Sequence, residues 1–100
     1  MQNLTTEEFK ARVFDFEKNK EWKYAGDKPC IVDFYADWCG PCRIMAPVLD
    51  EFAHQRAGEV LVLKLDTDAD GAVAQRFGIR GIPTIIAFRE GREARRHVGA

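Results

Sequence analysis

Apolar residues along this chain fall into short uninterrupted runs that alternate with longer segments of helical spacing. The spacing of apolar residues predicts helices over about residues 6–17 and 41–56, and a shorter helix that contains Val73, Ala74 and Phe77. The apolar runs predict strands at about residues 30–36, 60–65 and 84–88, and the turn signal at Glu90-Gly91 predicts a further strand at 93–98. The first two runs show little alternation, which is typical of parallel strands that are covered on both faces.

Local signals support these elements and their order. Thr5-Thr6-Glu7-Glu8 matches a capping box at the start of the first helix, and there is room for a short strand before Thr5. Asp68 or Asp70 is expected to cap the short helix, and Glu90-Gly91 predicts a hairpin turn between the last two strands. Strands joined through helices are expected to be parallel, and the final hairpin antiparallel. The predicted fold is α/β, a three-layer sandwich with a mixed central sheet and helices on both faces.

Length and charge narrow the possible functions. One hundred residues fit a single domain, 1–100, and the net charge of −1 argues against a nucleic-acid or membrane-surface role. No apolar run approaches the ~18–20 residues of a membrane span, and the polar start lacks the apolar stretch of a signal peptide. A cytoplasmic location follows if Met1 is the native start. Residues 80–100 hold five arginines against two glutamates, which we interpret as a solvated hairpin and tail, with partner binding as the alternative.

The most informative motif is Cys39-Gly40-Pro41-Cys42, between a buried strand and a helix. A helix N-terminus presents free N–H groups and partial positive charge, which lowers the pKa of a cysteine placed there and favours the thiolate that attacks disulfides. Pro41 suits the first turn because it lacks an N–H that would have no helical partner, and Gly40 leaves the sulfur of Cys39 accessible. We therefore expect Cys39 to be exposed and to attack first. Cys42, one turn into the helix, is expected to be shielded and to resolve the mixed disulfide.

The sequence also permits two other interpretations of Cys39 and Cys42. The pair could be half of a zinc site, but only Cys30, His54 and His97 remain as partners and none has ligand spacing. It could also be two buried structural cysteines. Cys30 itself lies about 20 Å of strand away from Cys39, beyond disulfide reach, and we predict that it is inert.

Asp33 interrupts an otherwise apolar central strand. Buried carboxylates are rare without a partner or a role, and burial raises their pKa. If Asp33 lies on the face covered by the next helix, it sits beneath the two cysteines and can take the proton from Cys42, directly or through a water molecule. The alternative is a structural carboxylate bonded to backbone or to Lys64. Lys64 by itself is best explained as a lysine whose stem packs while its ammonium reaches solvent.

Three further residues are candidates for substrate contact. Pro83 stands at the start of a strand, where a cis bond is possible. If Pro83 faces the cysteines, the backbone of Ile82 could pair with an extended substrate chain. Trp38 precedes Cys39 in a loop, and we predict that it covers the site rather than filling the core.

At these residues the chain resembles the thioredoxin family. The resemblance extends from Leu4 to Ala100 and is most specific over Val32–Cys42, which contains Trp-Cys-Gly-Pro-Cys. Pro47, Lys64 and Ile82-Pro83-Thr84 reinforce it. A lone Cys-x-x-Cys is a weak signal, but this longer motif with a downstream Ile-Pro-Thr is a strong one.

The resemblance implies a thioredoxin-like fold and a protein-disulfide reductase. It implies attack by Cys39, resolution by Cys42 with help from Asp33, tuning of the couple toward reduction by Gly40-Pro41, and a cis bond at Pro83. It further implies disulfide-containing protein substrates, an NADPH-dependent thioredoxin reductase as the electron donor, and no bound cofactor. The alternatives are a disulfide oxidase or isomerase, and a non-enzymatic binding module on the same fold.

The chain departs from the family pattern at three places. Tyr35 stands where members commonly have Trp, and the loop Lys18–Pro29 is longer and more charged than in compact members. The sequence ends at Val98-Gly99-Ala100, whereas members continue into a C-terminal helix that packs beside the helix after the cysteines. An uncovered apolar sheet face promotes association. We therefore predict lowered stability or self-association through that face.

Overall fold

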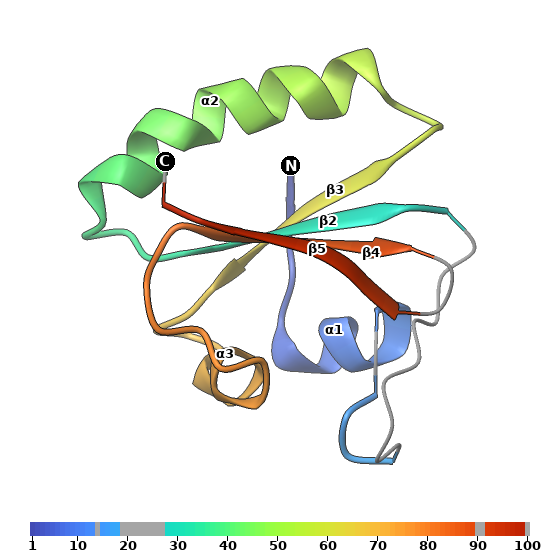
Figure 1. Cartoon of the computed structure of the whole chain (residues 1–100), viewed down its shortest axis with the longest axis vertical. Coiled ribbons are helices and arrows are strands. Elements are labelled where there is room, and N and C mark those ends of the chain that lie inside the picture. The colour runs from blue at the N-terminus through green and yellow to red at the C-terminus, as the bar shows by residue number, and fades with distance from the viewer. Residues whose placement is uncertain (14, 19–27, 90–91, 100) are drawn as a thin grey trace.

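Five strands form one mixed sheet with helices on both faces in the computed structural model, which describes residues 1–13, 15–18, 28–89 and 92–99 (Figure 1). The elements in chain order are β1 (Gln2–Asn3), α1 (Thr6–Arg12), β2 (Cys30–Tyr35), α2 (Gly40–Gln55), β3 (Leu61–Asp66), α3 (Gly71–Arg76), β4 (Thr84–Arg89) and β5 (Arg92–Val98). The strand order across the sheet is β1-β3-β2-β4-β5. Helix α2 covers one face, and α1 and α3 lie on the other (Figure 1). The predicted fold class is confirmed.

The direction of β4 corrects one prediction. β1, β3 and β2 are mutually parallel, and β4 and β5 form the expected antiparallel pair. However, β4 runs antiparallel to β2, although a helix precedes it and a parallel crossover was expected. The six residues of α3 span only about 9 Å, less than half the length of a six-residue strand. The chain therefore re-enters the sheet near the C-terminal end of β3. From there β4 runs antiparallel to β2 and β3.

The main core lies between the sheet and the α1/α3 layer. Phe9 of α1 packs edge-on against Phe77 and Phe88, with ring centroids 5.3 and 6.3 Å apart. The strands contribute alternate residues to this side, which are fully or almost fully buried: Val32, Phe34, Leu63, Leu65, Ile86 and Phe88. Because side chains alternate along a strand, the intervening residues of β2, β3 and β4 face α2.

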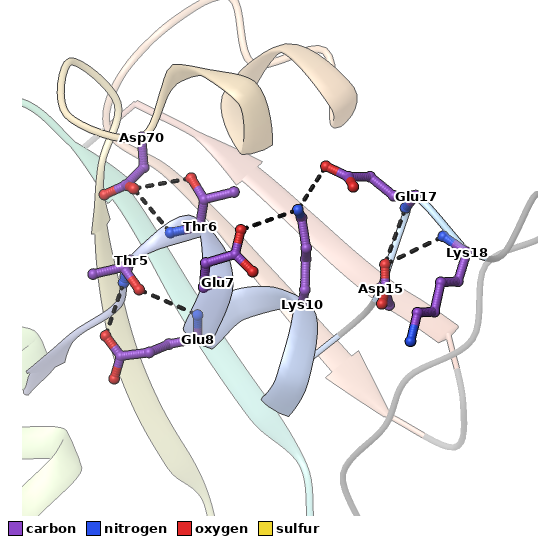
Figure 2. Close-up of polar contacts among 9 residues, drawn as sticks. All are labelled: Thr5, Thr6, Glu7, Glu8, Lys10, Asp15, Glu17, Lys18 and Asp70. Carbon is purple, nitrogen blue, oxygen red and sulfur yellow. Dashed lines mark hydrogen bonds and ion pairs between the residues drawn. The ribbon is translucent and has the colours of Figure 1, made fainter.

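Helix α1 begins as predicted but is shorter. The Glu8 N–H donates to the Thr5 hydroxyl, and the Thr5 N–H donates to the Glu8 carboxylate, which completes the capping box (Figure 2). The helix ends at Arg12 rather than near residue 17. The Asp15 carboxylate accepts the N–H groups of Glu17 and Lys18, a local bonding pattern that competes with helix continuation.

Asp70 precedes α3, but its side chain makes no cap hydrogen bond to that helix. Its carboxylate instead accepts from the backbone N–H and the hydroxyl of Thr6, at 2.8 and 2.9 Å (Figure 2). Asp70 is therefore the N-cap residue, as expected, but the expected side-chain hydrogen bond is not formed, and Asp70 joins the starts of α1 and α3. The prediction of a turn at Glu90-Gly91 and most of the long loop before Pro29 lie outside the described residues.

The register places a row of side chains across the face of the sheet that carries α2. Lys64 lies opposite Asp33, Asp33 opposite Ile85, and Ile85 opposite His97. Asp50 of α2 binds the N-terminal amine before β1, so this helix lies over the β1/β3 side of the row. The β4/β5 side has no helix above it among the described residues, and no described helix has the length and apolarity needed to cross a bilayer.

Candidate active site

Cys39 and Cys42 are joined in a disulfide where β2 passes into α2. Cys39 is the N-cap residue of α2, and its sulfur accepts the backbone N–H of Cys42 at 3.2 Å. Pro41 occupies the first turn, as expected, where a missing N–H costs no helical hydrogen bond. A Cβ at Gly40 would meet nothing within 4 Å, so this position opens to solvent beside the disulfide. The sulfur of Cys39 therefore occupies the position at which a helix N-terminus stabilises negative charge.

The expected difference in exposure between the two cysteines is wrong. Cys39 is 4 % exposed and Cys42 is 3 % exposed. Both pack with Ala36, and the partly buried side chains of Tyr35 and Ile82 lie against this group. The cover over Cys39 comes from a loop more than forty residues downstream, which local sequence could not reveal.

Asp33 lies beneath the disulfide on the α2 side of the sheet. It is 2 % exposed, and its buried Oδ1 has no hydrogen-bond partner among the described residues. Burial raises the pKa of Asp33 to about 6, and the positive charge of Lys64 on the neighbouring strand partly offsets this rise. The predicted burial is confirmed. The alternative of a carboxylate satisfied at both oxygens by the protein does not hold for Oδ1.

A cavity of about 170 Å³ connects Asp33 to Cys42. Both residues line it, and so do Lys64 from β3 and Ala46 from α2. A cavity of this size with polar lining has room for water molecules. Asp33 and Cys42 thus border the same cavity, whereas Cys39 does not line it.

The loop before β4 covers the other side of the disulfide. The Ile82–Pro83 peptide bond is cis, as the family resemblance implied. The carbonyl oxygen of Ile82 lies 3.8 Å from the sulfur of Cys39. The Thr84 hydroxyl donates to the Gly81 carbonyl, and the Gly99 N–H donates to the Pro83 carbonyl at 2.8 Å, so both ends of this loop are held. The backbone carbonyl of Ile82 therefore borders the sulfur of Cys39.

Trp38 lies on the surface with 68 % of its area exposed, which confirms that it is not a core residue. Its indole Nε1 donates to the Asp68 carboxylate at 2.8 Å. Sequence reasoning considered Asp68 only as a helix cap and missed this contact, since the two residues are thirty positions apart. No local signal points to it.

Acidic side chains gather on the β3 side of the disulfide. Asp66 ends β3, and Asp37 follows β2. Burial raises the pKa of Tyr35, and the charges of Asp66 and Asp37 raise it further. The ammonium of Lys64 lies 5.2 Å from the centroid of the Tyr35 ring. Tyr35, which replaces the commoner Trp of the family, thus has carboxylates and the Lys64 ammonium as near neighbours, and Arg43 lines the same cavity.

The structure also shows where Cys30 lies and bears on the zinc interpretation of Cys39 and Cys42. Cys30 is buried in β2 and takes no part in the disulfide. Within the described residues, no group of three or more His, Cys, Asp or Glu side chains could hold a metal ion. The zinc interpretation of Cys39 and Cys42 therefore has no support from the described part of the chain.

The chain was compared with known proteins. The thioredoxin family model matches residues 1–100. A thioredoxin of Alicyclobacillus acidocaldarius is 48% identical over 83 residues, which cover 83% of this chain and 79% of the relative. Thioredoxin 1 of Nostoc sp. is 43% identical over 97 residues, which cover 97% of this chain and 81% of the relative. A thioredoxin of Borreliella burgdorferi is 38% identical over 84 residues, which cover 84% of this chain and 72% of the relative.

The match over the full chain and the cysteine pair at the start of α2 agree with the fold and with the chemistry of the site. This chain belongs to the thioredoxin family and is a thiol–disulfide oxidoreductase.

Proposed function

We propose that the chain works as a reductase of protein disulfides, with Cys39 as the attacking thiol and Cys42 as the resolving thiol. The observation that carries this assignment is the hydrogen bond from the Cys42 N–H to the sulfur of Cys39 at the N-cap of α2. In the reduced protein this donor and the helix dipole stabilise a thiolate at Cys39. No equivalent N-cap position exists for Cys42, which lies within the first turn.

In the first step the Cys39 thiolate attacks a substrate disulfide, which forms a mixed disulfide and releases one substrate thiolate. Cys42 then attacks the sulfur of Cys39, which forms the Cys39–Cys42 disulfide and releases the second substrate thiolate. Cys42 must lose its proton for this attack. Asp33 is the base for that proton, because it shares the cavity with Cys42 and its raised pKa lies near neutral pH.

The surface around the disulfide suits an extended substrate chain. Trp38 provides an exposed aromatic face, and the backbone of Ile82 and Pro83 borders Cys39. Backbone pairing with Ile82 would hold a substrate with little sequence preference. Gly40 keeps the approach to Cys39 open, and Gly40 with Pro41 tunes the couple toward reduction.

We further propose that an NADPH-dependent thioredoxin reductase supplies the electrons and that the protein works in the cytoplasm. Support for the donor is family membership, since the dithiol must be regenerated after each turnover. A redox titration against glutathione tests the direction of electron flow. A reducing potential is expected, and a strongly oxidising potential would favour the oxidase or isomerase alternative.

Self-association through the part of the sheet face that no described helix covers is a separate proposal. Ile31, Ile85 and Ala87 line a hollow of about 440 Å³ there, and Ile44 and Val48 of α2 are 75% and 62% exposed. Burial of these apolar side chains against a second copy would stabilise a dimer. Sedimentation velocity tests this proposal, and a monomer with a high melting temperature at all concentrations would contradict it.

The main experiment follows reduction of insulin disulfides with dithiothreitol as the electron source. Activity is expected for the natural chain and is expected to be lost in Cys39→Ser. In Cys42→Ser the mixed disulfide is expected to accumulate, because attack proceeds without resolution. Full activity of Cys39→Ser would refute the assigned nucleophile, and absence of activity in the natural chain would refute the reductase proposal.

A further inference from the structure

Strand β5 combines an edge position with a high density of positive charge. It is the last strand of the sheet among the described residues, so its outer edge has no strand beside it. Arg92, Arg95, Arg96 and His97 are all exposed. Glu93 is the one acidic residue of the strand, and it forms an ion pair with Arg96 at 3.0 Å.

The charge of the chain is strongly uneven. Residues 76–98 contain six arginines and two glutamates, a net charge of +4. Because the whole chain carries −1, the rest carries −5. The near-neutral net charge of the chain is therefore the sum of a basic C-terminal part and an acidic remainder.

The arginines of β5 border two surface hollows. Arg92 and Arg96, with Arg76 of α3, line a hollow of about 300 Å³. Arg95, Arg96 and His97 line the hollow of about 440 Å³ on the α2 side. Arg95 pairs with Ala87 and Arg96 with the core residue Ile86, so the two side chains leave opposite faces of the strand, and Arg96 borders both hollows.

The basic strand ends beside the loop that borders the disulfide. Val98, at the end of β5, approaches Gly81 within 3.3 Å of where a Cβ would stand, and the Gly99 N–H binds the Pro83 carbonyl. That loop also contains the Ile82 carbonyl near the sulfur of Cys39. At about 3.3 Å per residue, Arg95 lies roughly 10 Å and Arg92 roughly 20 Å along the strand from Val98.

Opposite charges thus lie on the two sides of the disulfide. Asp37, Asp66 and Asp68 are on the β3 side, and the arginines of β5 are on the β4 side. A substrate segment with acidic residues would be repelled from the first side and attracted to the second. Complementary charge at an interface rim raises association rates and fixes orientation.

We propose that β5 and its arginines form a docking surface for acidic segments of substrate proteins. This proposal rests on the reductase function proposed above and defines its substrate class: disulfides whose flanking sequence, on one side, is rich in Asp and Glu. The acidic segment lies along β5 while the disulfide meets Cys39.

The test uses the full chain with Cys39 and Cys42 reduced beforehand, and three synthetic peptides. All three contain the same disulfide ring, followed by a tail in which Ser alternates with Glu, Gln or Lys. A second set places the same tails before the ring, because the direction of the bound segment is not assumed. Acid-quenched single-turnover reactions give the second-order rate constant of reduction for each peptide.

The Glu peptide of at least one set is expected to react roughly tenfold faster than its Gln counterpart at about 0.05 M salt, and the Lys peptide more slowly than both. At about 0.5 M salt the rates are expected to converge, because the Debye length falls to a few ångströms. The variant Arg95→Glu is expected to lower the Glu-to-Gln rate ratio about fivefold or more. The matched control Arg56→Glu makes the same charge change at the far end of α2, and its ratio is expected to stay within about twofold of the natural chain.

Each other outcome overturns the proposal in a recognisable way. Equal reduction of the Glu and Gln peptides in both sets contradicts acidic selection but leaves the reductase function intact. An equal loss of selectivity in Arg95→Glu and Arg56→Glu shows that net charge acts without a docking surface on β5. Reduction of none of the peptides refutes the reductase proposal together with this one.

Discussion

Replacement of Asp33 by Asn removes a buried negative charge whose desolvation lowers the free energy of unfolding. The pKa of Asp33 is raised from 3.8 to about 6 because the carboxylate is desolvated, with Lys64 opposing the rise. Protonation of the folded protein is therefore easier than protonation of the unfolded chain. Between these two pKa values the folded state binds a proton that the unfolded state lacks, so the free energy of unfolding falls as pH rises.

The shift of about two units corresponds to about 3 kcal/mol above pH 6, at about 1.36 kcal/mol per unit. Asp33 is only 2 % exposed, so solvent screening reduces this value little. Below pH 4 the carboxyl is protonated in both states and the penalty disappears. We expect Asp33→Asn to raise the free energy of unfolding by about 3 kcal/mol at pH 8 and by less than about 1 kcal/mol at pH 4.

Guanidinium unfolding of the disulfide form, measured from pH 4 to pH 8, tests this expectation. The oxidised form is used so that the Cys39 and Cys42 thiols do not titrate. Asp50→Asn is the matched control, since Asp50 is exposed and pairs with the N-terminal amine, and its effect is expected to stay below about 1 kcal/mol. A stability difference between Asp33→Asn and the natural chain that is constant over this pH range would refute the desolvation argument.

Three other predictions address the charge beside Asp33, the core and the first helix. Lys64→Met removes the cation that lowers the pKa of Asp33, so this pKa is expected to rise above about 6. NMR of the Asp33 carboxyl carbon measures it, and an unchanged pKa would show that Lys64 does not act on Asp33. Leu63→Ala removes a fully buried side chain and is expected to destabilise the fold by about 2–5 kcal/mol in denaturant unfolding, and a loss below 1 kcal/mol would contradict the packing described here. Thr5→Ala breaks the capping box with Glu8 and is expected to cost about 1 kcal/mol, whereas Thr5→Ser is expected to restore most of it (Figure 2).

Local signals in the sequence were sufficient for most of the fold. The strands β2 and β3 are mostly apolar runs, and both were placed within one residue of their observed bounds. The capping box at Thr5 gave the correct start of α1, but the bonds of Asp15 that accompany its early end were not foreseen. The direction of β4 was also missed, because it depends on how far the short α3 carries the chain.

The candidate site shows the same division between local and distant effects. Asp33 was placed beneath the cysteines because its strand leads directly into α2, and the shared cavity with Cys42 confirms that position. The burial of Cys39 could not be predicted, since its cover includes Ile82 from another part of the chain. The same limitation hid the bond from Trp38 to Asp68.

At the N-cap of α2, Cys39 is placed where the helix N-terminus would stabilise a thiolate, whereas Cys42 lies within the first turn. Alkylation of the reduced protein with iodoacetamide at a series of pH values, followed by mass spectrometry of the separate peptides, measures both thiols in one experiment. We expect Cys39 to be labelled first, with a pH midpoint well below the pKa of about 8.5 of an ordinary cysteine. Cys42 is expected to react more slowly. Equal and slow labelling of the two sulfurs, as for free cysteine, would show that the N-terminus of α2 does not stabilise a thiolate at Cys39.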